Sequence, residues 1–157
     1  MKTADEVVRA YDAVMANANK VTPKSLINGV LVQPMAPAGL EMMIGARIDP
    51  IFGPLIIVGM GGILVELLKD TALELAPITQ HEAKAMLQKL KGHALLSGFR
   101  GSDAVNLDAL ADIIVRLSEF ADDQQDLIAE LDVNPLICAG GRMIAVDALI
   151  VRAATTQ

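Results

Sequence analysis

Three oxygen-bearing side chains near the end of the sequence have a spacing suited to cation binding. Glu130, Asp132 and Asn134 recur at every second position, so in an extended strand they lie on one face. The residues between and after them take the opposite face: Leu131, Val133 and Pro135. The pattern predicts a strand with one polar and one apolar face.

A tight turn after this strand predicts a cross-strand partner for Asn134. Gly140-Gly141 suits a two-residue hairpin, because glycine tolerates positive φ. With these two glycines at the centre, Ala139 pairs with Arg142, and Asn134 pairs with Asp147. Directly opposite residues have Cβ atoms about 5 Å apart, and magnesium takes oxygen ligands. The residues alone leave two readings open: a magnesium-binding pair with Asp132 beside it, or a solvated polar face on an edge hairpin.

The rest of the chain supplies the elements that must position this pair. Apolar spacing and a Thr79–Glu82 capping box predict helices over 4–19, 79–91 and 106–121. Alternation and short apolar runs predict strands over 29–33, 41–48, 55–58, 63–66, 72–75, 129–137 and 142–151. Because no regular βαβ alternation occurs, the order predicts an α+β fold: a mixed or antiparallel sheet packed with helices in a two-layer sandwich.

Composition limits the class of protein. The chain has 157 residues, of which 53% are hydrophobic and 20% charged, which suits one domain with an aliphatic core. A net charge of −6 argues against a nucleic-acid partner. The longest uncharged run, 50–65, is short and broken by glycine and proline, so no membrane span is expected. The single cysteine, Cys138, and the lack of a signal-like N-terminus lead us to expect a cytoplasmic location.

Several segments together resemble a known family. Residues 130–136 and 145–148 resemble the end of the ATP-grasp domain in ADP-forming acetyl- and acyl-CoA synthetases, and succinyl-CoA synthetase β chains are similar there. Further segments agree in the family's order: 29–35, 41–54, 59–66 with Asp70, and 96–101. The resemblance implies an ATP-grasp-type lobe that binds ATP or ADP with Mg²⁺.

The resemblance also implies roles for individual residues at the nucleotide. Asn134 and Asp147 would hold its magnesium. The backbone of Met35 would meet adenine, with Gln33 and Pro34 shaping the hinge. Glu41 would face the ribose or the phosphates.

Two further residues keep alternative readings. Glu66 is either a catalytic polar group near the phosphates or a structural partner of Lys69 or Arg47. Arg100 is either a phosphate contact or a plain surface residue. The glycines of 59–62 form either a tight turn or an anion-binding nest.

The main departure from the family lies at the front of the sequence. The family has a phosphate-binding lysine, a glycine-rich loop and a phosphohistidine upstream of the segment that matches 4–19, and neither His81 nor His93 fits the last. We therefore expect 1–157 to be a single partial ATP-grasp domain, inactive alone. Its expected partners are the nucleotide, an upstream lobe, and CoA-binding domains or a subunit.

The function that the resemblance implies is acid–thiol ligation. Phosphoryl transfer would run through an acyl phosphate and a phosphohistidine. Two alternatives remain: a non-catalytic, metabolite-sensing region of a larger protein acetyltransferase, or an interaction domain whose exposed strands pair with a partner, including a second copy in a homo-oligomer.

Overall fold

The first of two units is a helix followed by an extended segment. The computed structural model describes residues 3–21, 23, 26–62, 70–98 and 103–154, and the chain divides into units Met1–Met35 and Ala36–Gln157. Helix α1 (Ala4–Val21) buries no residue, so its stripe of Val7, Tyr11 and Val14 is exposed.

The strand predicted over 29–33 is wrong. Residues 28–35 have no regular secondary structure, and Leu31 and Val32 are exposed by 81% and 69%. A strand needs a neighbour for its backbone hydrogen bonds, and the described part of the first unit offers none to this segment.

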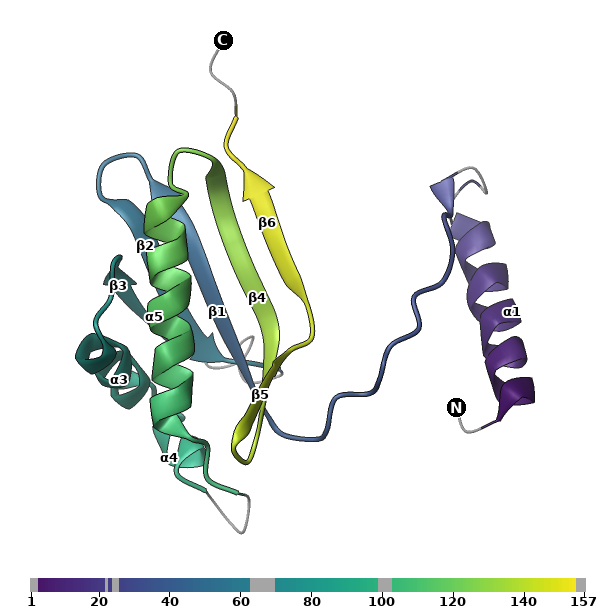
Figure 1. Cartoon of the computed structure of the whole chain (residues 1–157), viewed down its shortest axis with the longest axis horizontal. Coiled ribbons are helices and arrows are strands. Elements are labelled where there is room, and N and C mark those ends of the chain that lie inside the picture. Colours follow the sequence, from purple (N-terminus) through teal and green to yellow (C-terminus); the bar gives the residue numbers. More distant parts are fainter. Residues whose placement is uncertain (1–2, 22, 24–25, 63–69, 99–102, 155–157) are drawn as a thin grey trace. The chain divides into compact units, whose positions relative to one another are not determined.

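The second unit is built on an antiparallel sheet of six strands (Figure 1). The strand order is β3-β2-β1-β4-β5, and β6 also pairs with β4. The strands are β1 (Leu40–Asp49), β2 (Gly53–Met60), β3 (Thr71–Leu75), β4 (Ile128–Ala139), β5 (Arg142–Ala145) and β6 (Ala148–Arg152).

The helices of this unit cover one face of the sheet (Figure 1). They are α3 (Gln80–Lys89), the short α4 (His93–Leu96) and α5 (Leu107–Asp123). Met42 and Ile44 of β1 and Leu110 and Ile114 of α5 are fully buried in the shared core. The predicted two-layer α+β sandwich is confirmed. Separately, no helix in the described ranges is long and apolar enough to cross a membrane.

Helix α3 begins as predicted but ends early. Both bonds of the Thr79–Glu82 capping box are present, while the helix stops at Lys89 instead of 91. The cause is Asp70, a buried residue whose carboxylate accepts the N–H groups of Lys91 at 2.8 Å and Gly92 at 2.7 Å. These bonds hold 91–92 as a turn against the start of β3.

The end hairpin has the predicted register with two irregularities. Ala139 pairs with Arg142 around Gly140, whose φ is +58°. The strand predicted over 142–151 is interrupted at Val146-Asp147, so β5 and β6 are separate. The pairing of β1 with β4 shifts from Ile44–Val133 to Met42–Leu136. Because Asn134 and Pro135 both oppose Met43, the core face passes to Leu136, and the placement predicted for Pro135 is wrong.

Candidate functional site

The face of the sheet that α3 and α5 leave uncovered, which we call the outer face, carries some of the polar residues singled out from the sequence: Glu41, Asp132 and Asn134. Along β1 this face carries Glu41, Met43, Gly45 and Arg47, alternating with the buried core residues. Along β4 it carries Glu130 and Asp132, opposite Arg47 and Gly45. The predicted alternation therefore brings the outer-face residues of β1 beside those of β4.

Asn134 and Asp147 lie opposite each other, as the hairpin predicted. The backbone N–H of Asn134 donates to the carbonyl oxygen of Asp147 at 3.2 Å, and that of Val146 donates to Pro135 at 3.0 Å. Both side chains are exposed. The irregularity at Asn134-Pro135 keeps Asn134 on the outer face while Leu136 returns to the core.

Asp132 belongs to the same cluster of oxygens. Its Oδ1 is buried and has no hydrogen-bond partner in the part of the chain that the structure describes. Burial raises the pKa of the Asp132 carboxyl, and the charges of Glu130 and Asp147 raise it further, while hydrogen bonding from the Asn134 side chain opposes the shift. An unpartnered carboxylate oxygen among acidic neighbours is the environment that a cation relieves.

The chemistry of this donor set fits a hard cation such as Mg²⁺. Asp132, Asn134 and Asp147 offer only oxygen atoms, and Asp147 Oδ1 also accepts the N–H of Ala148 at 2.9 Å. Within the described ranges, no three acidic, histidine or cysteine side chains converge tightly enough to hold a metal by themselves. A cation here would therefore need further oxygens, such as those of water or a phosphate.

Glu41 lies on the same face, against two glycines. The N–H of Gly61 donates to the carbonyl oxygen of Glu41 at 2.6 Å. A Cβ on Gly62 would lie 2.8 Å from Oε2 of Glu41, and Gly62 has φ +65°, which fits the tight-turn reading of 59–62. A Cβ on Gly61 would lie 2.7 Å from the backbone carbonyl carbon of Glu41, so the close approach of these two backbones requires glycine at position 61.

Three of the remaining predicted residues belong to the first unit. Gln33, Pro34 and Met35 are exposed in the extended part of the first unit. Glu66 and Arg100 lie outside the described residues, as does the strand predicted over 63–66. The sequence pattern predicts Asp132 beside the pair but carries no signal for its unpartnered oxygen.

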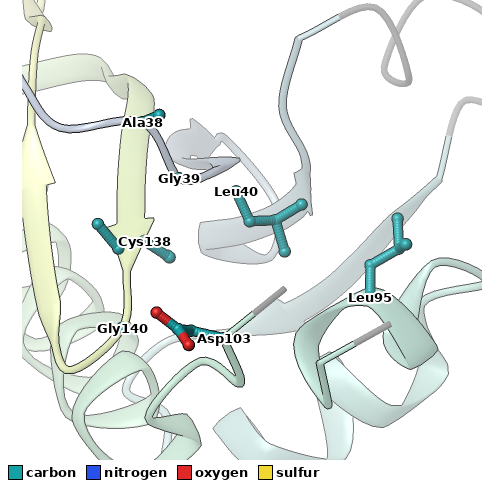
Figure 2. A pocket seen from close by; sticks show the side chains of 8 residues that line it. Ala38, Gly39, Leu40, Leu95, Asp103, Cys138 and Gly140 are labelled. Carbon is teal, nitrogen blue, oxygen red and sulfur yellow. The ribbon is translucent and has the colours of Figure 1, made fainter. Parts of the chain in front are cut away.

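A separate cavity of about 660 Å³ lies at the end of the sheet, on the helix side (Figure 2). Leu40, Leu95 and Cys138 line it, and Asp103 lies near Gly140. Burial raises the pKa of the Cys138 thiol to about 11, so it is not a thiolate at neutral pH. This cavity does not contain the oxygen cluster of the outer face.

Comparison with known proteins shows the family of this chain. A model described as an ATP-grasp domain matches residues 1–151, and the chain belongs to this family. It is 40% identical over 151 residues to subunit beta of the ADP-forming acetate–CoA ligase I of Pyrococcus furiosus, covering 96% of this chain and 65% of the relative. It is 42% identical over 132 residues to the ADP-forming 4-hydroxybutyrate–CoA ligase of Nitrosopumilus maritimus, covering 84% of this chain and 19% of the relative.

A solved structure shares the fold. It is the dinucleotide-forming acetyl-coenzyme A synthetase 1 of Ca. Korarchaeum cryptofilum in complex with coenzyme A and Mg-AMPPCP, with a phosphohistidine segment pointing towards the nucleotide-binding site. The TM-score is 0.84 at 34% identity, covering 98% of this chain and 66% of that one. The chain thus spans about two thirds of the length of the Pyrococcus furiosus subunit and of the Ca. Korarchaeum cryptofilum chain. It spans 19% of the Nitrosopumilus maritimus ligase.

Proposed function

We propose that this chain is the ATP/ADP- and Mg²⁺-binding portion of an ADP-forming acyl-CoA synthetase. The observation that carries the proposal is the cluster on the outer face: Asn134 directly opposite Asp147, with an unpartnered Asp132 oxygen beside them. Membership of the ATP-grasp family and the ligase relatives support it.

The proposed roles follow from the chemistry of phosphoryl transfer, which depends on positioning and on neutralising charge. Magnesium would supply that neutralisation when bound. Asn134 and Asp147 would hold it, with Asp132 contributing a carboxylate oxygen. Glu41, at the edge of the same face, would contact the ribose or the phosphates.

The hinge and the two residues outside the described ranges complete the proposed site. Gln33, Pro34 and Met35 would meet the adenine, where the exposed backbone of an extended segment can hydrogen-bond its edge. Glu66 and Arg100 would lie toward the phosphates. The reaction would be acid–thiol ligation through an acyl phosphate and a phosphohistidine.

The proposed partners are further parts of the synthetase. Helix α1 exposes an apolar stripe, and Leu31, Val32 and Met35 are exposed in the following segment. Exposed apolar side chains that line one face of a helix mark an interaction site. We assign it to an ATP-grasp lobe like the one that the relatives' additional length would provide, and we assign coenzyme A binding to other domains or a subunit.

Calorimetry on the whole chain tests the proposal. We expect ADP to bind when Mg²⁺ is present and binding to be lost with EDTA or with Asp147→Asn, since a carboxylate ligand is removed. Asp123→Asn, at the exposed end of α5, is the matched control and should bind like wild type. Binding that ignores magnesium and Asp147, or no binding even with the additional lobe supplied, would refute the proposal.

A further inference from the structure

Gly45 is directly opposite Asp132 in the pairing of β1 with β4. A Cβ built on Gly45 would lie 3.0 Å from Cγ2 of Ile57, 3.3 Å from the carbonyl oxygen of Leu131 and 3.7 Å from Oδ1 of Asp132. The missing side chain therefore leaves only a narrow space on the outer face, bordered by Ile57 on one side and Asp132 on the other.

This space is local to one position. The next outer-face residues along β1, Met43 and Arg47, have long side chains, and both border the same pocket of about 310 Å³ as Gly45 and Asp132. The Asp132 carboxylate lies over the space above Gly45, and this is where its Oδ1 is buried without a partner. A side chain longer than a methyl group at position 45 would compete with that oxygen for the space.

We propose that Gly45 is a positioning residue for the cation site, because the empty position opposite Asp132 lets its carboxylate lie against the sheet, within hydrogen-bonding reach of the Asn134 side chain. The inference rests on the proposed function. Gly45 has no side chain to bind a metal or a nucleotide, so it would act through Asp132. Groups that orient a metal ligand typically change metal affinity by about 10- to 100-fold when altered.

The test is the affinity for Mn²⁺ in the presence of ADP, measured by electron paramagnetic resonance on the whole chain. We expect Gly45→Val to weaken Mn²⁺ binding about tenfold, because its methyl groups take the space of Oδ1. Gly45→Ala should have a smaller effect in the same direction, since its Cβ would be at ordinary contact distance from that oxygen, 3.7 Å, and closer to Ile57 Cγ2 and the Leu131 carbonyl oxygen, at 3.0 and 3.3 Å. Gly141→Ala is the control, because nothing lies within 4 Å of a Cβ there.

A double-mutant cycle separates positioning from a general loss of structure. In an Asp132→Asn background, Gly45→Val should cause no further loss of Mn²⁺ affinity. If the losses add instead, Gly45 does not act through Asp132 and the inference is wrong. If Gly45→Val does not fold, the same cycle is run with Gly45→Ala, and additive losses again overturn the inference.

The outcomes also separate this inference from the proposed function. If the wild-type chain, with the additional lobe supplied, binds no Mn²⁺ with ADP, both are wrong. If it binds, Asp147→Asn abolishes binding and Gly45→Val binds like wild type, only the positioning role is wrong.

Discussion

The pKa of the Asp132 carboxyl depends on the other acidic residues of the cluster. This pKa is raised by burial first and by Glu130 and Asp147 next. The folded protein therefore holds the proton of this carboxyl more tightly than the unfolded chain does. Ionised Asp132 destabilises the metal-free fold, and a bound cation would offset this.

This gives a prediction about pH. The ordinary pKa of an aspartate is 3.8, and the pKa of Asp132 in the folded protein is higher. As pH rises between these two pKa values, the contribution of Asp132 to the free energy of unfolding falls. Above both pKa values the destabilisation by ionised Asp132 is complete. In EDTA, Asp132→Asn should therefore unfold at higher denaturant than wild type at pH 7, with the difference vanishing below the unfolded pKa. Urea unfolding across a pH series measures it.

Asp49 provides a control, because its pKa is shifted in the opposite direction. The N–H groups of Ile51 and Phe52 lower the pKa of its carboxyl. Its contribution is present above the unfolded pKa and is lost as pH falls through the folded pKa, so Asp49→Ala should destabilise at pH 7 and less so in acid. A stabilising effect of Asp132→Asn that stays constant down to acid pH would contradict the account of Asp132.

At the scale of elements, a buried hydroxyl joins α5 to the start of α3. Ser118 Oγ accepts the N–H of Ile78 at 2.9 Å and donates to the carbonyl oxygen of Val115 at 2.7 Å, and the residue is fully buried. Sequence patterns show Ser118 only as a polar residue within a helix. Its bond to a residue 40 positions away exists because α3 and α5 pack together.

Ser118→Ala should destabilise the chain by about 1–3 kcal/mol, because the Ile78 N–H stays buried without an acceptor. Chemical denaturation checks this. Ser97→Ala, at an exposed position after α4, should change stability by less than about 0.5 kcal/mol. Equal effects of the two substitutions would show that the Ile78 bond contributes nothing specific.

The elements also show what the sequence predicts and what it does not. Strand β1 was predictable from alternation, and the start of α3 from Thr79 and Glu82, because both signals are local. The irregularity at Asn134-Pro135 and the interruption at Val146-Asp147 depend on pairing between strands, which periodicity does not encode. The segment 29–33 was misassigned because its composition suits a strand but pairing depends on a neighbour.

For the whole molecule, the site was predictable in outline only. Counting outward from Gly140-Gly141 placed Asn134 opposite Asp147, and the structure confirms that register. The assignment of these residues to magnesium came from resemblance and remains a proposal, as do the roles of Glu41 and the hinge at Gln33–Met35. The effect of Gly45 on Asp132 emerged only with three strands in place, since Ile57 comes from β2.

The central claim is that the cluster around Asn134 and Asp147 holds the magnesium of a bound nucleotide. An amide-resolved NMR titration with Mg-ADP tests it most directly, with Asp147→Asn as the comparison. We predict that Asp132, Asn134 and Asp147 shift together with Glu41 and the hinge near Met35, and that the substitution abolishes these shifts. If, even with the additional lobe supplied, saturating Mg-ADP leaves the cluster unmoved or shifts the same residues in Asp147→Asn, the claim is wrong.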